Sequence, residues 1–418
     1  MRVYLHTFGC KANQYDTELL RGALEAAGAT IVDRAPVADA AIINTCTVTH
    51  VSEGKMRGFV RRVARQNPGI RTVVIGCSAA LDTGTLAKLP NVVGVVGGVA
   101  PGDVLARLGL PSGYESDGLR TFGRGSRAWV RIQDGCDEHC TFCATTLARG
   151  DHRSRRPESI VAEARRLAAQ HREIVLTGIH IGSYGRDLAG EGGLGTLVAQ
   201  LIDAVPSARF RLSSVEATEV DDTLVHLLRT APERLAPHLH APLQSGSDRV
   251  LRRMGRHWYT ARTYRERIER IAAGLPAFGL GADVMVGFPG ETAADFAETR
   301  RILEDLPFTY LHVFPYSERP DTPARRLGAP VAPPVVAARS AELRSLGESK
   351  GQAYRAGRAG TPADVVTLGR SRGRCEGLTE DYLTVSWSTG KPHATRFRAQ
   401  LALESNGHLE ATPIEDAA

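Results

Sequence analysis

The sequence of 418 residues contains no run of eighteen apolar residues, so a membrane-spanning helix is not expected. The opening segment, MRVYLHTFGCKANQ, lacks the charged and then apolar regions of a signal peptide. Internal repeats and low-complexity tracts are also absent. These absences argue against membrane-embedded and secreted proteins, and they predict a globular protein of the cytoplasm.

Cysteine is scarce, with seven residues in the chain. An odd number without a secretion signal argues against a disulfide framework, whereas reduced thiols suit metal ligation. The length predicts two or three domains. A net charge of +6 is compatible with an anionic partner but does not require one.

The first segment, residues 1–112, alternates strand-like and helix-like stretches. Strands are expected at Arg2–His6, Ala40–Asn44, Thr72–Ile75 and Asn91–Val96, and helices at Gln14–Ala27 and Lys55–Gln66. This βαβ rhythm predicts a parallel sheet covered by helices. The turn-rich stretch PSGYESDG at 111–118 is expected to be a linker.

A second segment, residues 122–350, predicts an α/β domain with six βα units in an incomplete barrel. Its expected strands are Ala128–Gln133, Ile174–Thr177, Arg209–Ser213, His238–Pro242, Ala282–Val286 and Tyr310–Phe314. Helices such as Ser159–Gln170 and Ala261–Ala273 separate the strands, and a helix at Val335–Tyr354 closes the domain.

The last segment, residues 355–418, predicts a small β-barrel. Its expected strands are Ala363–Leu368, Tyr382–Trp387 and Thr395–Leu403. Between 351 and 400 there are eight Lys or Arg residues against four Asp or Glu residues.

Three cysteines, Cys136, Cys140 and Cys143, form a tight triplet in QDGCDEHCTFC, directly after a predicted strand. Three thiolates on a cluster of four irons leave one iron open to a substrate. Phe142 is expected to shield such a cluster from water. A zinc site is the alternative, but zinc normally takes four ligands; His139 and His152 lie nearby, and no fourth cysteine follows.

The remaining cysteines include a dispersed triplet, Cys10, Cys46 and Cys77, each two to four residues past a predicted strand. The carboxyl ends of parallel strands share one edge of a sheet, so these thiols are expected to converge and hold a second cluster. The plainer alternative is three ordinary buried cysteines. Cys375 is interpreted as structural or incidental.

The spacing of the tight triplet resembles that of the radical S-adenosylmethionine (SAM) superfamily, and the two triplets together resemble the methylthiotransferase family. The resemblance covers essentially the whole chain, including a C-terminal segment similar to the RNA-binding TRAM module. HTFGCKANQYDTE, LTGIHIGSYGRDL, HAPLQSGSDRVLRRMGR, VMVGFPGET and HVFPYSERPDTPA look most like the branch that acts on N6-threonylcarbamoyladenosine in tRNA. After Cys143 the family typically has a Pro-Tyr or similar pair before Ala-Arg-Gly, whereas this chain has Thr145 and Thr146.

The resemblance implies two 4Fe-4S clusters, held by Cys10, Cys46 and Cys77 and by the catalytic Cys136, Cys140 and Cys143. It also implies SAM as cofactor, with the anticodon stem-loop of tRNA and an electron donor such as a flavodoxin or ferredoxin as partners. SAM contacts are expected in loops after barrel strands, at Gly178, Ser214, Glu216, Gln244 and Ser245. GFPGET is not a phosphate loop, because the Lys-Ser/Thr ending is absent.

The implied reaction adds a methylthio group at C2 of N6-threonylcarbamoyladenosine beside the anticodon, because a radical can attack a C–H bond that is not acidic. The same chemistry on N6-isopentenyladenosine or on a ribosomal protein is the nearest alternative. An RNA-binding protein with structural zinc and a two-cluster electron carrier are more distant alternatives. The basic stretches Lys55–Arg65 and Arg149–Arg156 are candidates for phosphate contacts or for solvated surfaces.

Overall fold

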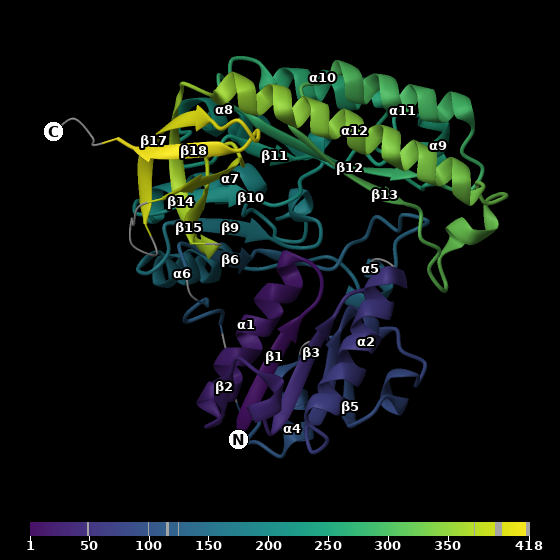
Figure 1. The fold of residues 1–418 in the computed structure, drawn as a ribbon, viewed down its shortest axis with the longest axis vertical. Helices are drawn as coiled ribbons and strands as arrows, with labels where there is room; N and C mark the ends of the chain where they lie inside the picture. Colours follow the sequence, from purple (N-terminus) through teal and green to yellow (C-terminus); the bar gives the residue numbers. More distant parts are fainter. Residues whose placement is uncertain are drawn as a thin grey trace.

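The computed structural model describes residues 1–47, 50–98, 100–113, 117–123, 125–371, 373–388 and 395–414. Figure 1 shows an N-terminal sheet domain in purple and blue, a central partial barrel in teal and green, and a small yellow C-terminal barrel. The fold class is therefore the α/β arrangement that the sequence predicts. Part of the expected linker at 111–118, residues 114–116, lies outside the described residues.

The N-terminal domain is a five-stranded parallel sheet with the strand order β2-β1-β3-β4-β5. Its strands are β1 (Arg2–Thr7), β2 (Thr30–Val32), β3 (Ala40–Thr45), β4 (Arg71–Gly76) and β5 (Val92–Gly97). Its helices are α1 (Lys11–Ala26), α2 (His50–Gln66), α3 (Cys77–Ala80) and α4 (Pro101–Leu108). The central strand β3 is buried along its whole length, as expected for a strand covered on both faces. The edge strand β2 was not predicted, because three residues carry too little pattern.

The central domain has six parallel strands in an incomplete barrel. They are β6 (Arg127–Arg131), β9 (Glu173–Thr177), β10 (Arg209–Leu212), β11 (His238–His240), β12 (Gly279–Val286) and β13 (Tyr310–Pro315). Parallel bridges at Ser214–His240 and Phe210–Leu235 join the two three-stranded halves of the barrel. No pairing joins β6 to β13 within the described residues, so the barrel stays open on that side.

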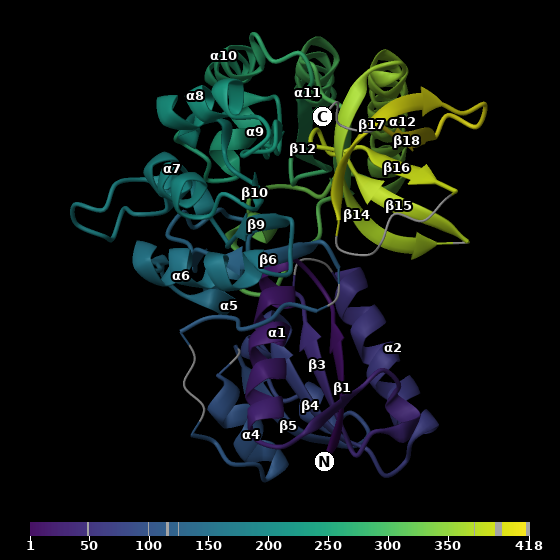
Figure 2. The same cartoon turned by 90° about the vertical axis from the view of Figure 1, so that its left-hand side faces the viewer.

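Helices cover the outside of the partial barrel (Figure 2). They are α6 (Pro157–Ala168), α7 (Leu194–Ala204), α8 (Asp222–Thr230), α9 (Asp248–Arg253), α10 (Ala261–Ala272), α11 (Ala293–Asp305) and α12 (Pro333–Arg358). Alternate strand residues such as Ala128, Ile174 and Phe210 pack against these helices. The other residues of the same strands therefore face the barrel interior. No described helix is both long and apolar enough to cross a membrane.

The C-terminal domain is a closed barrel of five strands, in the order β14-β15-β16-β18-β17. Its strands are β14 (Pro362–Ser371), β15 (Arg374–Leu378), β16 (Thr384–Trp387), β17 (Arg396–Leu403) and β18 (Leu409–Pro413). The sequence predicted three of them, and it missed the short strands β15 and β18. Cys375 is buried in the core of this barrel, which agrees with a structural role.

The C-terminal barrel covers the amino ends of the central strands. Arg211 donates hydrogen bonds to the backbone carbonyls of Thr379 and Glu380, both at 2.9 Å. The ring of Tyr382 stacks on His238, with 4.2 Å between the ring centroids. The C-terminal barrel thus occupies the amino ends of β10 and β11, at the opposite end of these strands from their carboxyl ends.

The N-terminal domain approaches the partial barrel through α1, which lies beside β6. The indole nitrogen of Trp129 donates to Gln14 Oε1 at 2.6 Å, and the hydroxyl of Tyr15 donates to Glu163 at 3.0 Å. Arg131 forms an ion pair with Asp16. These contacts bring the carboxyl edge of the N-terminal sheet to the carboxyl ends of the barrel strands.

Candidate functional site

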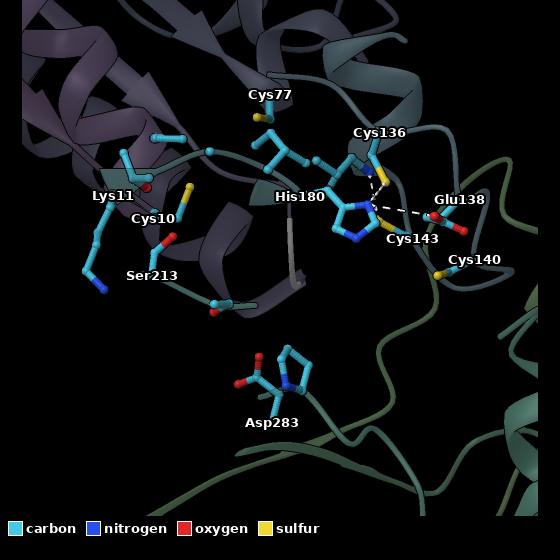
Figure 3. A pocket seen from close by; sticks show the side chains of 18 of the residues that line it. Cys10, Lys11, Cys77, Cys136, Glu138, Cys140, Cys143, His180, Ser213 and Asp283 are labelled. Carbon is cyan, nitrogen blue, oxygen red and sulfur yellow. Dashed lines mark hydrogen bonds and ion pairs between the residues drawn. The ribbon is translucent and has the colours of Figure 1, made fainter. Parts of the chain in front are cut away.

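A cavity of about 560 Å³ lies where the two sets of strand ends meet, and all six cysteines of both triplets line it (Figure 3). Expected site residues Gly178, Ser214, Glu216 and Gln244 also line this cavity. The structure therefore brings together expected site residues that are up to 234 positions apart in the chain, between Cys10 and Gln244.

The dispersed triplet sits at the carboxyl ends of β1, β3 and β4, which are neighbours in the sheet. Asn13 links two of its members, because Asn13 Oδ1 lies 3.8 Å from Cys10 Sγ and 3.9 Å from Cys77 Sγ. Gly9 brings the first loop close to the third member. A Cβ on Gly9 would lie 3.2 Å from Cys46 Sγ, and Gly9 has a φ of +110° that favours glycine. The expected convergence of these three cysteines is therefore found.

The tight triplet lies in the loop between β7 (Gln133–Asp134) and α5 (Thr145–Arg149). The backbone N–H of Thr145 donates to Cys143 Sγ at 3.3 Å, and Arg256 donates to Cys140 Sγ at 3.4 Å. His180 Nδ1 lies 3.7 Å from Cys136 Sγ, and its Nε2 lies 2.8 Å from Glu219. Each sulfur atom of this triplet thus has a nitrogen atom in contact with it.

Arg149 connects the two triplets across the domain interface. Its Nε donates to Cys77 Sγ at 3.4 Å, and its Nη2 donates to Asn13 and to Asp16, both at 2.7 Å. Arg149 follows the tight triplet in sequence but contacts the dispersed triplet in space. This residue corrects one expectation, because it belongs to the basic stretch Arg149–Arg156 that was a candidate for phosphate contacts.

In the rest of the stretch Arg149–Arg156, some arginines form contacts within the protein and others are exposed to solvent. Arg155 is held by Glu163 and by the backbone carbonyl of Arg131, and it donates to the hydroxyl of Tyr15 in α1 at 3.2 Å, so it too contacts the N-terminal domain. Arg153 is exposed. The helix α2 differs, because its basic residues Lys55, Arg57, Arg61, Arg62 and Arg65 are exposed.

The thiols of both triplets are suited to binding an iron–sulfur cluster rather than to acting as free nucleophiles. Burial raises the pKa of Cys140 to about 12, and burial also raises the pKa of Cys77. Such thiols become thiolates when they bind a metal, which removes the proton. In neither triplet do all three sulfur atoms lie within 4.8 Å of one another, as far as the described groups extend. Tetrahedral zinc with Zn–S bonds of about 2.3 Å would need sulfur atoms about 3.8 Å apart, so the spacing disfavours zinc.

The part of the cavity wall beside the tight triplet carries features that suit a polar ligand such as SAM. Gln244 has a φ of +62°, and its side-chain oxygen is buried without a hydrogen-bond partner among the described residues. Strain and an unsatisfied polar atom at a cavity wall are typical of a binding site. Glu216 instead binds Arg256 and the indole of Trp258. Gly178 packs so tightly that a Cβ there would lie 2.6 Å from the carbonyl oxygen of Gln133.

Ser245 is the expected SAM contact that the structure does not bring to the cavity. Its side chain is fully buried, and its hydroxyl lies 3.2 Å from that of Thr299 in α11. The left-handed conformation of Gln244 turns the chain here, so Ser245 packs against the helix.

Several cavity residues were missed by sequence reasoning. They are Lys11, Asn13, His180, Arg256 and Asp283. Lys11 follows Cys10 directly, and burial together with the like charges of Arg127 and Arg211 lowers its pKa to about 8. For His180, burial would lower the pKa, but the hydrogen bonds with Cys136 and Glu219 outweigh it and raise the pKa to about 10. The sequence signal that could have identified these cavity residues was their position beside the cysteine motifs or the strand ends.

Two family models match the chain. The first, described as uncharacterized protein family UPF0004, covers residues 2–98, and the second, the radical SAM superfamily, covers residues 130–303. The matches fall on the N-terminal sheet and on most of the partial barrel. An iron–sulfur cluster and SAM are therefore cofactors of this chain.

Curated relatives extend the similarity over most of the chain. A threonylcarbamoyladenosine tRNA methylthiotransferase of Bacillus subtilis is 37% identical, with 84% of this chain and 81% of the relative covered. The enzyme of the same description from Aquifex aeolicus is 34% identical over 92% of this chain and 96% of the relative. A tRNA-2-methylthio-N(6)-dimethylallyladenosine synthase of Acidithiobacillus ferrooxidans is 34% identical over 90% and 88% of the two chains.

Solved structures agree on the fold. The radical SAM methyltransferase TsrM from Kitasatospora setae, with cobalamin and a [4Fe-4S] cluster bound, gives a TM-score of 0.59. It is 14% identical, and the alignment covers 77% of this chain and 73% of that chain. At this identity the likeness concerns the fold alone.

Proposed function

Since this chain belongs to the family of radical SAM methylthiotransferases, we propose that it adds a methylthio group at C2 of N6-threonylcarbamoyladenosine, next to the anticodon of tRNA. The observation that carries the proposal is the single cavity lined by both cysteine triplets, in a chain whose relatives modify tRNA. When bound, the cofactors supply an electron, an alkyl radical, a methyl group and sulfur. The two cysteine triplets that would hold the clusters line one cavity, so a base bound in this cavity could be reached from both.

We propose that the dispersed triplet holds a second 4Fe-4S cluster. Asn13 and Arg149 support this, because they place an amide and a guanidinium against the thiols, and a guanidinium stabilises thiolate charge. Anaerobically purified protein is then expected to hold about eight irons per chain, and a variant with alanine at all three dispersed cysteines about four. Equal iron content in the two proteins would reject the second cluster.

The tRNA is proposed to contact the exposed basic face of α2 and the C-terminal barrel. Lys55, Arg57, Arg61 and Arg65 are exposed on α2, and Arg370 and Arg398 are exposed on the barrel. Such contacts position a nucleic acid through its phosphates without reading its sequence. A flavodoxin or ferredoxin is the proposed electron donor, and the cytoplasm is the proposed location.

Nucleoside mass spectrometry tests the reaction. A strain that lacks this protein is expected to lose 2-methylthio-N6-threonylcarbamoyladenosine and to regain it with the wild-type chain, whereas Cys140→Ala does not restore it. Unchanged levels of this nucleoside in the deletion strain would reject the proposal. Loss of the methylthio form of N6-isopentenyladenosine would point instead to the dimethylallyl branch, one member of which is 34% identical to this chain.

A further inference from the structure

The cavity wall carries one charge that the described residues leave unpaired. Lys11 lines the cavity and is partly buried, yet its ammonium group forms no hydrogen bond or ion pair with any residue that the structure describes. The other charged residues of the wall have partners: Arg256 with Glu216, His180 with Glu219, Glu138 with Arg186, and Asp283 with His240 and His312. Lys11 is therefore the wall residue available to an anionic ligand.

Arginines of the central strands add to the positive charge around the ammonium group of Lys11. Three arginines of the central strands share a single carboxylate, that of the fully buried Glu173. They are Arg127, Arg209 and Arg211. Arg209 has a second carboxylate, Asp364, at 3.3 Å, which leaves a positive excess even before Lys11 is counted. A cation in such surroundings is stabilised when a ligand brings a negative charge.

The position of Lys11 indicates which part of a ligand it meets. Lys11 follows Cys10, so its side chain starts at the dispersed triplet. In Figure 3 it runs past Ser213, away from Cys136, Cys140 and Cys143. An anion bound to Lys11 is thus on the side of the cavity away from the tight triplet.

We propose that Lys11 binds the free carboxylate of the threonylcarbamoyl group and thereby selects this nucleoside over one with an uncharged N6 substituent. This inference rests on the proposed function and adds a residue that determines substrate specificity. The threonylcarbamoyl group ends in a carboxylate, whereas an isopentenyl group is wholly apolar. An apolar substituent would leave the ammonium unpaired, which is the kind of mismatch that polar sites reject strongly.

The experiment crosses one substitution in the protein with one change in the substrate. The full chain, reconstituted with iron and sulfide and reduced with dithionite, is assayed with SAM on tRNA that contains N6-threonylcarbamoyladenosine. It is then assayed on the same tRNA after the threonyl carboxylate has been converted to a neutral amide. For the wild type, kcat/KM is expected to fall roughly 10- to 100-fold on amidation, the range of a hydrogen bond to a charged group.

In Lys11→Gln, kcat/KM on intact tRNA is expected to fall by a similar factor, and amidation is expected to cause no further loss. Lys88→Gln is the matched control, because Lys88 is exposed in the N-terminal domain and is not part of the cavity wall. The control is expected to behave as the wild type on both substrates. Formation of 5′-deoxyadenosine without tRNA is measured in parallel, and Lys11→Gln is expected to leave it within about twofold of the wild type.

Three results would overturn the inference. In the first, the wild type does not distinguish the two tRNAs, which would assign Lys11 to an RNA phosphate or to no ligand. In the second, Lys11→Gln still loses activity on amidation by the wild-type factor. In the third, Lys11→Gln loses 5′-deoxyadenosine formation without tRNA, which would place its effect on the cofactors. A wild type that methylthiolates neither tRNA rejects the proposed function itself, and with it this inference.

Discussion

The two cysteine triplets reach one cavity by different routes. The tight triplet lies within a single loop, so its spacing alone brings the sulfur atoms near each other. The dispersed triplet converges only because β1, β3 and β4 are neighbours in a parallel sheet. The first arrangement is a property of a short peptide, and the second is a property of a folded domain.

The two sites nevertheless have similar surroundings. Arg256 donates to Cys140 and Arg149 donates to Cys77, each at 3.4 Å from the sulfur atom. Both arginines are also tied to carboxylates, Glu216 and Asp16 respectively. A thiolate site of either origin thus has an anchored guanidinium beside it, which stabilises the negative charge of the ligands.

The strongest test separates the two triplets by chemistry. Cys140→Ala is expected to lower 5′-deoxyadenosine formation to the level of a protein-free control, because it removes one ligand of the radical-forming site. Cys46→Ala is expected to keep 5′-deoxyadenosine formation but to abolish methylthiolation of tRNA. Quantification of both products by mass spectrometry checks this. If Cys46→Ala also abolished 5′-deoxyadenosine formation, the division of labour between the triplets would be wrong.

The second test concerns the arginine that spans the interface. Arg149→Gln removes a buried cation from Asp16, although Arg131 remains paired with that carboxylate. We expect the free energy of unfolding to fall by about 3 kcal/mol, at the low end of values for broken buried pairs. Urea unfolding of the cluster-free protein, followed by tryptophan fluorescence, to which Trp129 at the interface contributes, measures it.

Arg153→Gln is the control for Arg149→Gln. Arg153 lies in the same basic stretch but is exposed and hydrogen-bonds only to backbone carbonyls among the described contacts. Its substitution is expected to change the unfolding free energy by less than about 0.5 kcal/mol. Equal losses in the two variants would show that Arg149 has no special role at the interface.

The third test perturbs the dispersed triplet through its backbone. Gly9→Ala would place a Cβ 2.9 Å from Cys46 Cβ at a φ of +110°, which costs about 1–2 kcal/mol. We expect iron bound at the dispersed triplet to decrease while 5′-deoxyadenosine formation persists. Gly28→Ala is the control, because Gly28 also has a positive φ but a Cβ there meets no atom within 4 Å. A loss of iron in both variants would indicate general unfolding instead.

The comparison also explains what the sequence could predict. Both triplets were found, the tight one by spacing and the dispersed one by its positions after three hydrophobic strands. The strand order was not needed, because any parallel sheet places these ends along one edge. The six barrel strands were found because short apolar or alternating stretches, such as RFRL in β10 and GLGADVMV in β12, stand between helical stretches.

The polar partners of the site could not be predicted in this way. Arg149 belongs to a basic stretch that was a candidate for RNA phosphate contacts, and its partner Asp16 is 133 residues away in sequence. Lys11 sits in a motif that drew attention to Cys10, and its role depends on the buried arginines of another domain. Ser245 follows a strand as expected, yet one left-handed residue turns it toward α11. Long-range pairing of charges leaves little trace in local sequence.

The smallest expected effect concerns Thr145, where this chain departs from the usual pattern after the tight triplet. The contact with Cys143 Sγ comes from the backbone N–H of Thr145, and alanine keeps that group. Thr145→Ala is therefore expected to change the rate of 5′-deoxyadenosine formation by less than about threefold, because no hydrogen bond to the cluster ligand is lost. The threonine side chain is then free to differ between relatives. A tenfold loss in single-turnover assays would show instead that the side chain itself takes part in the site, and that the tight triplet depends on more than its loop.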